Sequence, residues 1–368
     1  LDEFQTGTCS IVLSNSDDRF NPLNTSSPYY DSANSKTKVK PFKKVRVSAA
    51  YDGTTYRIYT GFITGYPESF GGQGSDATVR VQAVDLFKLL NLNTIGSRGW
   101  LLGNTNRSLV GSARLGYADV QELSSARISR LLSAFGIASA DTTISTGDLQ
   151  VQAGVPTTTN LLAALRDVQS AEQGQFFIGA NGDRNYKRTQ QFASNATFGN
   201  GVGELPFSDV ITNFDESRIV NIVSVTRDGG TEQIIQNNDS IEEFGARQDS
   251  LTDTLNVSDS DALSVAEQRL AQFGISSPRV EGLVINPLGN VALWTQTLGR
   301  EVGDKITVKV PTPSSTVMEF DVHIESIRHT INAQNRTWSY NISTSAGSET
   351  GAWVLGSSRI GQDTNLAW

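Results

Sequence analysis

Apolar and polar residues alternate along most of the first 85 positions of the chain. Alternation with a period of two residues is typical of β-strands that bury one face. It predicts strands over 4–13, 44–51, 55–59, 61–66 and 77–84. Asp52-Gly53 separates the second of these strands from the third, and Asp-Gly between two β-rich runs is a strong hairpin signal. The region is therefore expected to form a small antiparallel barrel or sandwich.

In the middle of the chain the apolar spacing becomes helical. A short helix over 85–90 leaves the first β region, and the Gly- and Ser-punctuated stretch 93–116 is expected to be irregular. Longer helices are predicted over 118–135, ending at Gly136, and over 159–172. A strand, an Asn181-Gly182 turn and a second strand follow over 174–188.

Period-two alternation returns after residue 216. It predicts strands over 218–227, 232–236, 277–285, 305–310, 318–330 and 335–344. Between them, 240–245 is expected to be a loop with a short turn, and 258–261 to cap a helix that runs to Phe273. The order of strands and hairpins in 216–345 is similar to that in 1–90, which is consistent with a structural repeat, although sequence identity between the two segments is weak.

These patterns together predict a mainly β chain with an α+β insertion. Two small antiparallel β-barrel domains are expected, at 1–92 and at 216–345, and the second includes one helix. The insertion between them, 93–215, is expected to be a helix-hairpin domain. Residues 346–368 are rich in Gly and Ser and contain Trp353 and Trp368, so they are expected to form an arm or linker.

The composition points away from several functional classes. Hydrophobic residues make up 38% and charged residues 18% of the chain, which suits a β-rich virion or extracellular protein better than a cytosolic α/β enzyme. The net charge is −8, and the densest basic stretch, 36–44, is interpreted as a solvated loop before an edge strand, so specific nucleic-acid binding is not expected. No apolar stretch approaches the roughly 18 residues of a membrane span, and the first residues do not resemble a signal peptide.

Residues that carry chemistry are few. The single cysteine, Cys9, excludes an internal disulfide and a CxxC metal site, and is interpreted as a small core residue. The two histidines, His323 and His329, lie six residues apart on one predicted strand, so both are expected on the same face. Their apolar neighbours favour a structural role over metal binding or general-base catalysis.

Three further patterns fall short of a catalytic or binding motif. The acidic cluster at 15–18 lacks the Gly and Glu of a calcium loop, and the glycines at 199–203 lack the Lys-Ser/Thr of a phosphate loop. The 38 acidic residues do not by themselves specify a carboxylate pair for glycoside hydrolysis. No catalytic, cofactor-binding or metal-binding residue is therefore assigned, no cofactor is expected, and the chain is expected not to be an enzyme.

One loop resembles a known family. The run Asp18-Arg19-Phe20-Asn21-Pro22, followed by Asn24 and by Ser27-Pro28-Tyr29, is similar to the "RFxPxNxxSPY" loop of bacteriophage minor tail proteins. In that family the loop precedes a strand-turn-strand and a Gly-Phe-Ile segment, which correspond here to 45–59 and to Gly61-Phe62-Ile63. Weaker similarities, at 161–188 and 241–273, follow in the same order, and 346–368 has no counterpart. A structural role is assigned to the motif residues Arg19, Phe20, Pro22, Asn24, Ser27, Pro28 and Tyr29.

The resemblance implies a structural component of a phage tail tip or baseplate hub, at the distal end of the tail in the virion. Each chain would contribute two β-barrels, and three chains would form a homotrimeric ring with pseudo-sixfold symmetry that joins the tail tube to the tip. The implied partners are other copies of the chain, the distal tail or tube protein, the tape measure protein, and tip or receptor-binding proteins. The ring would leave a lumen for DNA passage, and a net acidic chain repels DNA by like charge.

Two alternatives remain open at this stage. The first is a sugar-binding host-attachment module of the tail, because six tyrosines of the first β region could stack on sugars: Tyr29, Tyr30, Tyr51, Tyr56, Tyr59 and Tyr66. The second is a cell-wall hydrolase that uses a pair of carboxylates.

Overall fold

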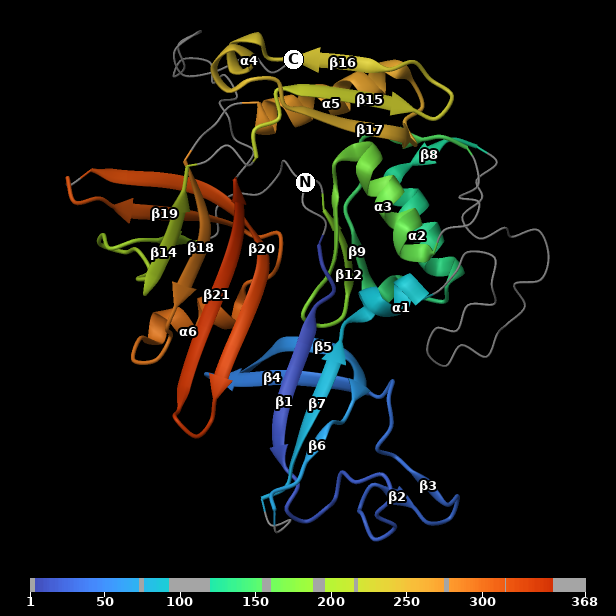
Figure 1. Cartoon of the computed structure of the whole chain (residues 1–368), viewed down its shortest axis with the longest axis vertical. Helices are drawn as coiled ribbons and strands as arrows, with labels where there is room; N and C mark the ends of the chain where they lie inside the picture. The colour runs from blue at the N-terminus through green and yellow to red at the C-terminus, as the bar shows by residue number, and fades with distance from the viewer. Residues whose placement is uncertain are drawn as a thin grey trace.

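The computed structural model describes residues 4–72, 76–92, 120–153, 160–187, 196–214, 218–274, 278–314 and 316–346. Over these residues the chain is mainly β, as the sequence predicts, and it contains six α-helices, two more than predicted (Figure 1). The stretch 93–116 and residues 347–368 of the expected arm lie outside the described residues. No helix in the described ranges is both long enough and apolar enough to cross a membrane.

The first sheet is antiparallel, with the strand order β1-β7-β5-β4. Its strands are β1 (Thr8–Ser14), β4 (Lys44–Tyr51), β5 (Thr54–Gly65) and β7 (Thr78–Val84), and the short β6 (Glu68–Ser69) pairs with β7. The Asp52-Gly53 hairpin is confirmed, and both residues have positive φ, as a tight hairpin turn with right-handed twist requires. The two strands expected over 55–66 form one continuous strand, β5.

Glycine is required within β5. A Cβ added at Gly61 would lie 2.5 Å from the carbonyl oxygen of Val84 on the neighbouring strand. Only glycine allows this close approach of the two backbones without a shift. This accounts physically for the first residue of the Gly61-Phe62-Ile63 segment.

A helical layer follows the first sheet. It comprises α1 (Leu86–Leu92), α2 (Ser124–Ala134) and α3 (Leu161–Glu172). The hairpin of β11 (Gln175–Ile178) and β12 (Arg184–Lys187) is confirmed, and β9 (Thr142–Ile144) pairs with β12 in parallel. The short 3₁₀ helix Ser139–Asp141 precedes β9. Asn160 caps α3 by accepting a hydrogen bond from the Ala163 N–H at 2.8 Å.

The predicted start of α2 is wrong. The helix begins at Ser124 because Glu122–Leu123 forms a short strand, β8, which pairs with β10 (Gln150–Val151). Val120, placed in the apolar stripe by periodicity, is 68% exposed. The predicted end is correct to one residue: the helix stops at Ala134, and Gly136 has a φ of +79°, as expected two residues past the last helical position.

One apolar core joins the helical layer to the first sheet. Its buried residues include Phe62 from β5, Leu90 from α1, Ile128 from α2, Leu165 from α3 and Tyr186 from β12. Since Phe62 belongs to the first sheet, this core holds the sheet and the helices together.

A separate three-stranded sheet lies at the top of Figure 1. It consists of β15 (Ile222–Arg227), β16 (Gln233–Gln236) and β17 (Gln248–Thr254), with β17 parallel to β15. Helix α5 (Asp259–Phe273) packs on it, and the predicted cap is a capping box of Ser258 and Asp261. The loop expected at 240–245 is wrong: α4 (Asn238–Phe244) forms there because Asn237 caps its first turn.

The last sheet has six strands in the order β13-β19-β20-β21-β18-β14. The strands are β13 (Thr197–Phe198), β14 (Asp209–Asn213), β18 (Arg279–Ile285), β19 (Lys305–Pro311), β20 (Val317–Asn332) and β21 (Thr337–Ala346). A helix that the sequence analysis missed, α6 (Val291–Gly299), connects β18 to β19. Strands β13 and β14 lie within 93–215, the range that the sequence analysis assigns to the insertion. The division of the chain into 1–92, 93–215, 216–345 and 346–368 stays a prediction.

The two sheets repeat one topology. The order β1-β7-β5-β4 of the first sheet recurs as β18-β21-β20-β19 in the last, with all of these pairings antiparallel. Both copies also carry a β-bulge at the same place: one extra residue interrupts the pairing of β5 with β7 at Thr64, and of β20 with β21 at Glu325. We call β1–β7 repeat 1 and β18–β21 repeat 2.

Candidate assembly surfaces

The family-like loop is a chain of linked turns. Backbone hydrogen bonds run from Asp18 to Asn15, Asn21 to Asp18, Asn24 to Asn21, Ser27 to Asn24 and Tyr30 to Ser27, with N···O distances of 2.9 to 3.4 Å. Every third residue is Asn, Asp or Ser, which are the residues preferred at the first position of such turns. We call residues 15–31 the motif loop.

Side chains fix the shape of the motif loop. Ser27 is buried, and its hydroxyl donates to the carbonyl oxygen of Arg19 at 2.5 Å. The amide of Asn24 donates to the carbonyl oxygen of Asp18 at 2.9 Å. The rings of Phe20 and Tyr29 stack with centroids 5.4 Å apart.

The other motif residues face solvent. Arg19 is exposed and pairs with Asp17, and Pro22, Pro28 and Tyr29 are exposed as well. Leu23, between them, is 85% exposed. The structure thus brings all seven motif residues into one rigid loop whose tip carries prolines, a leucine and an aromatic ring.

Asn15 anchors the motif loop to repeat 1. Its side chain is 1% exposed, accepts from the Phe20 N–H at 3.0 Å, and donates to Glu68 at 3.3 Å. Asn15→Ala is expected to lower the free energy of unfolding by about 1–3 kcal/mol, because it leaves a buried N–H without its acceptor. Chemical denaturation measures the difference. Ser16→Ala, at the exposed neighbouring position, is the control; an equal loss in both variants would contradict this role for Asn15.

An aromatic cluster joins the two repeats. Tyr51, at the tip of the β4–β5 hairpin, stacks on Trp294 of α6 at 5.8 Å, and its hydroxyl donates to the carbonyl oxygen of Val291 at 3.3 Å. Trp294 in turn meets Trp338 of β21 edge-on at 5.1 Å. The hairpin of repeat 1 is therefore seated on the β18–β19 connection and the sheet of repeat 2.

The prediction that the two histidines share a face is wrong. His323 lies on the face opposite the core residues Val322 and Ile324. The extra residue at Glu325 then shifts the alternation by one position, so His329 lies on the core side. There its ring is 4.9 Å from that of Tyr340, and its Nδ1 accepts from the Trp338 indole at 3.2 Å. Burial lowers the pKa of His329 to about 4, so the ring is neutral at pH 7.

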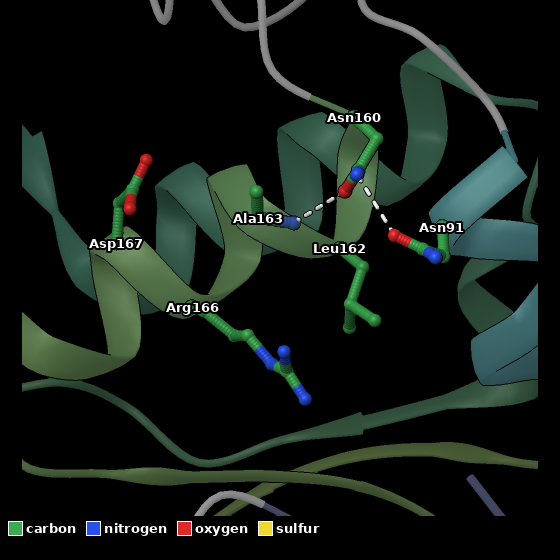
Figure 2. A pocket seen from close by; sticks show the side chains of 6 residues that line it. All are labelled: Asn91, Asn160, Leu162, Ala163, Arg166 and Asp167. Carbon is green, nitrogen blue, oxygen red and sulfur yellow. Dashed lines mark hydrogen bonds between the residues drawn. The ribbon is translucent and has the colours of Figure 1, made fainter. Parts of the chain in front are cut away.

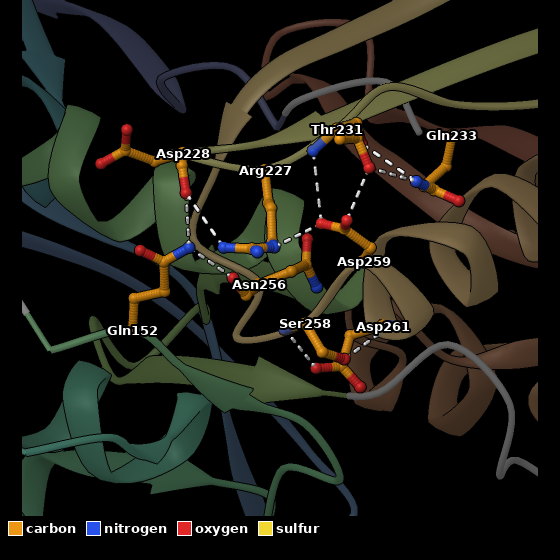
Figure 3. A network of polar contacts seen from close by, with 9 residues as sticks. All are labelled: Gln152, Arg227, Asp228, Thr231, Gln233, Asn256, Ser258, Asp259 and Asp261. Atoms are coloured by element: carbon orange, nitrogen blue, oxygen red, sulfur yellow. Dashed lines mark hydrogen bonds and ion pairs between the residues drawn. The ribbon is translucent and has the colours of Figure 1, made fainter.

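Polar contacts tie α5 to its surroundings (Figure 3). Asp259 accepts from Thr231 and from Arg227, both at 2.6 Å, and these bonds lower the pKa of its carboxyl. Gln152 donates to the carbonyl oxygens of Asp228 and Asn256, at 3.0 and 2.6 Å. The acidic residues at the start of α5 thus act as caps and connectors, as the sequence predicts.

A pocket lies beside α3 and is lined by Asn91, Asn160, Leu162, Ala163, Arg166 and Asp167 (Figure 2). Its polar groups bond within the protein: Asn160 donates to Asn91 at 2.8 Å, and Arg166 to the Phe4 carbonyl oxygen at 3.4 Å. Within the described ranges no group of three or more His, Cys, Asp or Glu side chains could hold a metal ion.

Glu172 is the last residue of α3, and its carboxylate oxygens accept several hydrogen bonds. It accepts from the hydroxyls of Ser124 and Tyr186, the latter at 3.1 Å, and from the backbone N–H groups of Asp148 and Leu149. This set of donors pins the end of α3 to the neighbouring loop, which is a structural task.

The tyrosines on which sugar binding depends are used within the protein. Tyr51 stacks on Trp294, Tyr29 stacks on Phe20, and the Tyr59 hydroxyl donates to the Gly7 carbonyl oxygen at 3.4 Å. Tyr56 and Tyr66 are half-buried. Packing therefore explains these side chains better than a row of free rings for sugars.

Comparisons with known proteins identify the fold. No protein-family model and no curated protein matches the sequence. Among solved structures, the 43 kDa tail protein of prophage MuSo2 from Shewanella oneidensis superimposes with a TM-score of 0.54, at 10% identity, over 94% of this chain and 91% of that one. A tail protein from Neisseria meningitidis superimposes with a TM-score of 0.52, at 9% identity, over 81% and 83%. Both of these structural neighbours are tail proteins, one of them from a prophage, and at these identities the likeness is one of fold.

Proposed function

We propose that this chain is a structural, non-enzymatic component of a phage tail, and that it forms the trimeric hub that joins the tail tube to the tip. The internal repeat is the observation that carries the proposal. One chain holds the same four-stranded sheet twice, so three chains present six equivalent sheets around a threefold axis. Such a ring meets a sixfold tube on one side and a threefold tip on the other.

The orientation of the repeats supports a ring. In Figure 1, β1 and β18 both run down the page, and β4 and β19 both point to the left. Equivalent strands of the two sheets therefore run in similar directions in this view, which is compatible with two neighbouring sheets in a ring. In this proposal the two curled sheets are the walls of the expected barrels, and the lumen that they enclose passes DNA.

The partners follow from the same proposal. Two faces of the ring are free for the tube or distal tail protein and for the tip or receptor-binding proteins, with the tape measure protein at the lumen. Similarity of fold to two tail proteins over most of the chain supports a place in the virion tail.

The mass of the purified chain in solution tests the proposal. We expect light scattering and native mass spectrometry to give about 119 kDa, three times the 39.7 kDa of one chain. A monomer that persists at high concentration would overturn the hub. Turnover of peptidoglycan by the purified chain would overturn the non-enzymatic assignment.

A further inference from the structure

The contact between the repeats joins two different parts. The first is the tip of the β4–β5 hairpin of repeat 1, with Tyr51 at its end. The second is α6, in the connection between β18 and β19 of repeat 2, with Trp294. Each repeat contains both parts, because each has a hairpin and a connection at equivalent places in its sheet.

Among the described residues, the aromatic contact between the repeats involves one of the two hairpins and one of the two connections. In the equivalent hairpin of repeat 2, β19 ends at Pro311 and β20 begins at Val317, and β19 points left in Figure 1, away from the first sheet and the helical layer. The connection in repeat 1 that is equivalent to α6 joins β1 to β4, and it begins with the motif loop. Figure 1 shows that α6 and the motif loop each follow the lower end of their strand, β18 or β1.

The end of the β19–β20 hairpin and the motif loop both expose apolar side chains. At the hairpin tip, Pro311 is exposed and Val317 is 56% exposed. In the motif loop, Leu23 is 85% and Tyr29 37% exposed, beside the exposed Pro22 and Pro28. Proline and valine packed against leucine and an aromatic ring bury apolar surface, which favours association of the two parts.

Charge complements the apolar match. The rest of the β1–β4 connection exposes Lys36, Lys38, Lys40 and Lys43. Next to the hairpin tip, β20 carries Glu319, whose side chain is 59% exposed although it lies 3.5 Å from Lys309. Opposite charges at the rim of a contact favour the correct pair of surfaces.

We propose that the tip of the β19–β20 hairpin packs against the motif loop of a second copy of this chain. The contact is head-to-tail, so it uses two different surfaces and closes into a ring when the rotation between copies is one third of a turn. The inference rests on the proposed trimeric hub and names its interface. It also gives the motif loop a function: the loop is the surface on which the β19–β20 hairpin of the next copy packs.

Charged substitutions test the interface by the mass of the assembly. Leu23→Asp and Val317→Asp each place a carboxylate in the contact, and each is expected to weaken the trimer by about 100-fold or more, which light scattering across a dilution series measures. Ile234→Asp is the matched control, because Ile234 is 55% exposed on β16 at the far end of the molecule and should leave the trimer unchanged. Circular dichroism and the melting temperature establish that each variant is folded.

Cysteine pairing tests the same contact without disturbing the fold. In a Cys9→Ser background, chains with Leu23→Cys are mixed with chains that carry Val317→Cys and exposed to a mild oxidant. We expect a cross-linked dimer in the mixture and much less in either chain alone, because each contact joins one surface of each kind. A trimer that forms no mixed cross-link and tolerates both Asp substitutions would overturn this interface and leave the hub proposal standing. An unmodified chain that never forms a trimer would overturn the hub itself.

Discussion

Replacing Trp294 by alanine is expected to lower the free energy of unfolding by about 2–4 kcal/mol, the range for loss of a large aromatic side chain that is partly buried. Trp294 stacks on Tyr51 of repeat 1 and meets Trp338 of repeat 2, so the substitution removes both contacts at once. Because this cluster seats the β4–β5 hairpin on repeat 2, the change also loosens the placement of one sheet relative to the other. We expect the trimer to dissociate at a higher concentration than that of the unmodified chain.

Two controls separate this effect from a general loss of helix α6. Trp294→Phe keeps a ring against Tyr51 and should lose clearly less stability. Val291→Ala lies on the same helix at a position that is 76% exposed, and should stay within about 0.5 kcal/mol of the unmodified chain. If denaturation curves give Trp294→Ala and Val291→Ala the same free energy of unfolding, the aromatic cluster does not hold the repeats together.

Acid is expected to weaken the protein through His329. Its pKa is about 4 in the folded chain, against about 6.5 when the chain is unfolded. As the pH falls below 6.5, the unfolded chain binds a proton that the folded chain does not, so the free energy of unfolding decreases. The loss is complete near pH 4 and reaches at most about 3 kcal/mol, while above pH 6.5 the group contributes no pH dependence.

His329→Phe isolates this contribution. The variant keeps a ring against Tyr340 but has no proton to bind, so its stability should fall less than that of the unmodified chain between pH 6.5 and pH 4. Other groups titrate in the same range, among them Asp85, whose pKa burial raises to about 6. Their effects cancel in the difference between the two proteins. Parallel stability curves for the two proteins over this range would contradict the assignment.

Turns and helix caps were predicted correctly where only residues close together in the sequence determine them. The Asp52-Gly53 hairpin and the cap of α5 at Ser258–Asp261 each need only a few adjacent residues to form, and a short sequence pattern predicts each of them. The three-residue repeat of turns through the motif loop was missed, although Asn15, Asp18, Asn21, Asn24 and Ser27 were there to be counted.

Features that depend on residues far apart in the sequence were not predicted by the hydrophobic periodicity. The bulge at Glu325 exists because of how β20 pairs with β21, so periodicity alone put His323 and His329 on one face. Val120 fits a helical stripe by spacing, yet Glu122–Leu123 pairs with β10 as a short strand, so the helix begins only at Ser124. Tyr51 and Trp294 are far apart in the sequence, and nothing local connects them. The contact that orients the two repeats was therefore beyond sequence reasoning.

The similar order of strands in the two β segments proved to be the most useful sequence observation. Its meaning became clear only from the shared sheet order and the shared bulge positions at Thr64 and Glu325. The repeat gives one chain two equivalent sheets that point the same way, and the assembly follows from that geometry.

Electron cryo-microscopy of the purified chain tests this account most directly, through the symmetry of the particle. The account predicts a closed ring of three chains, with six similar sheets alternating between repeat 1 and repeat 2 around a central channel. A particle in which repeat 1 and repeat 2 lie at different distances from the axis, or a twofold dimer, would contradict it.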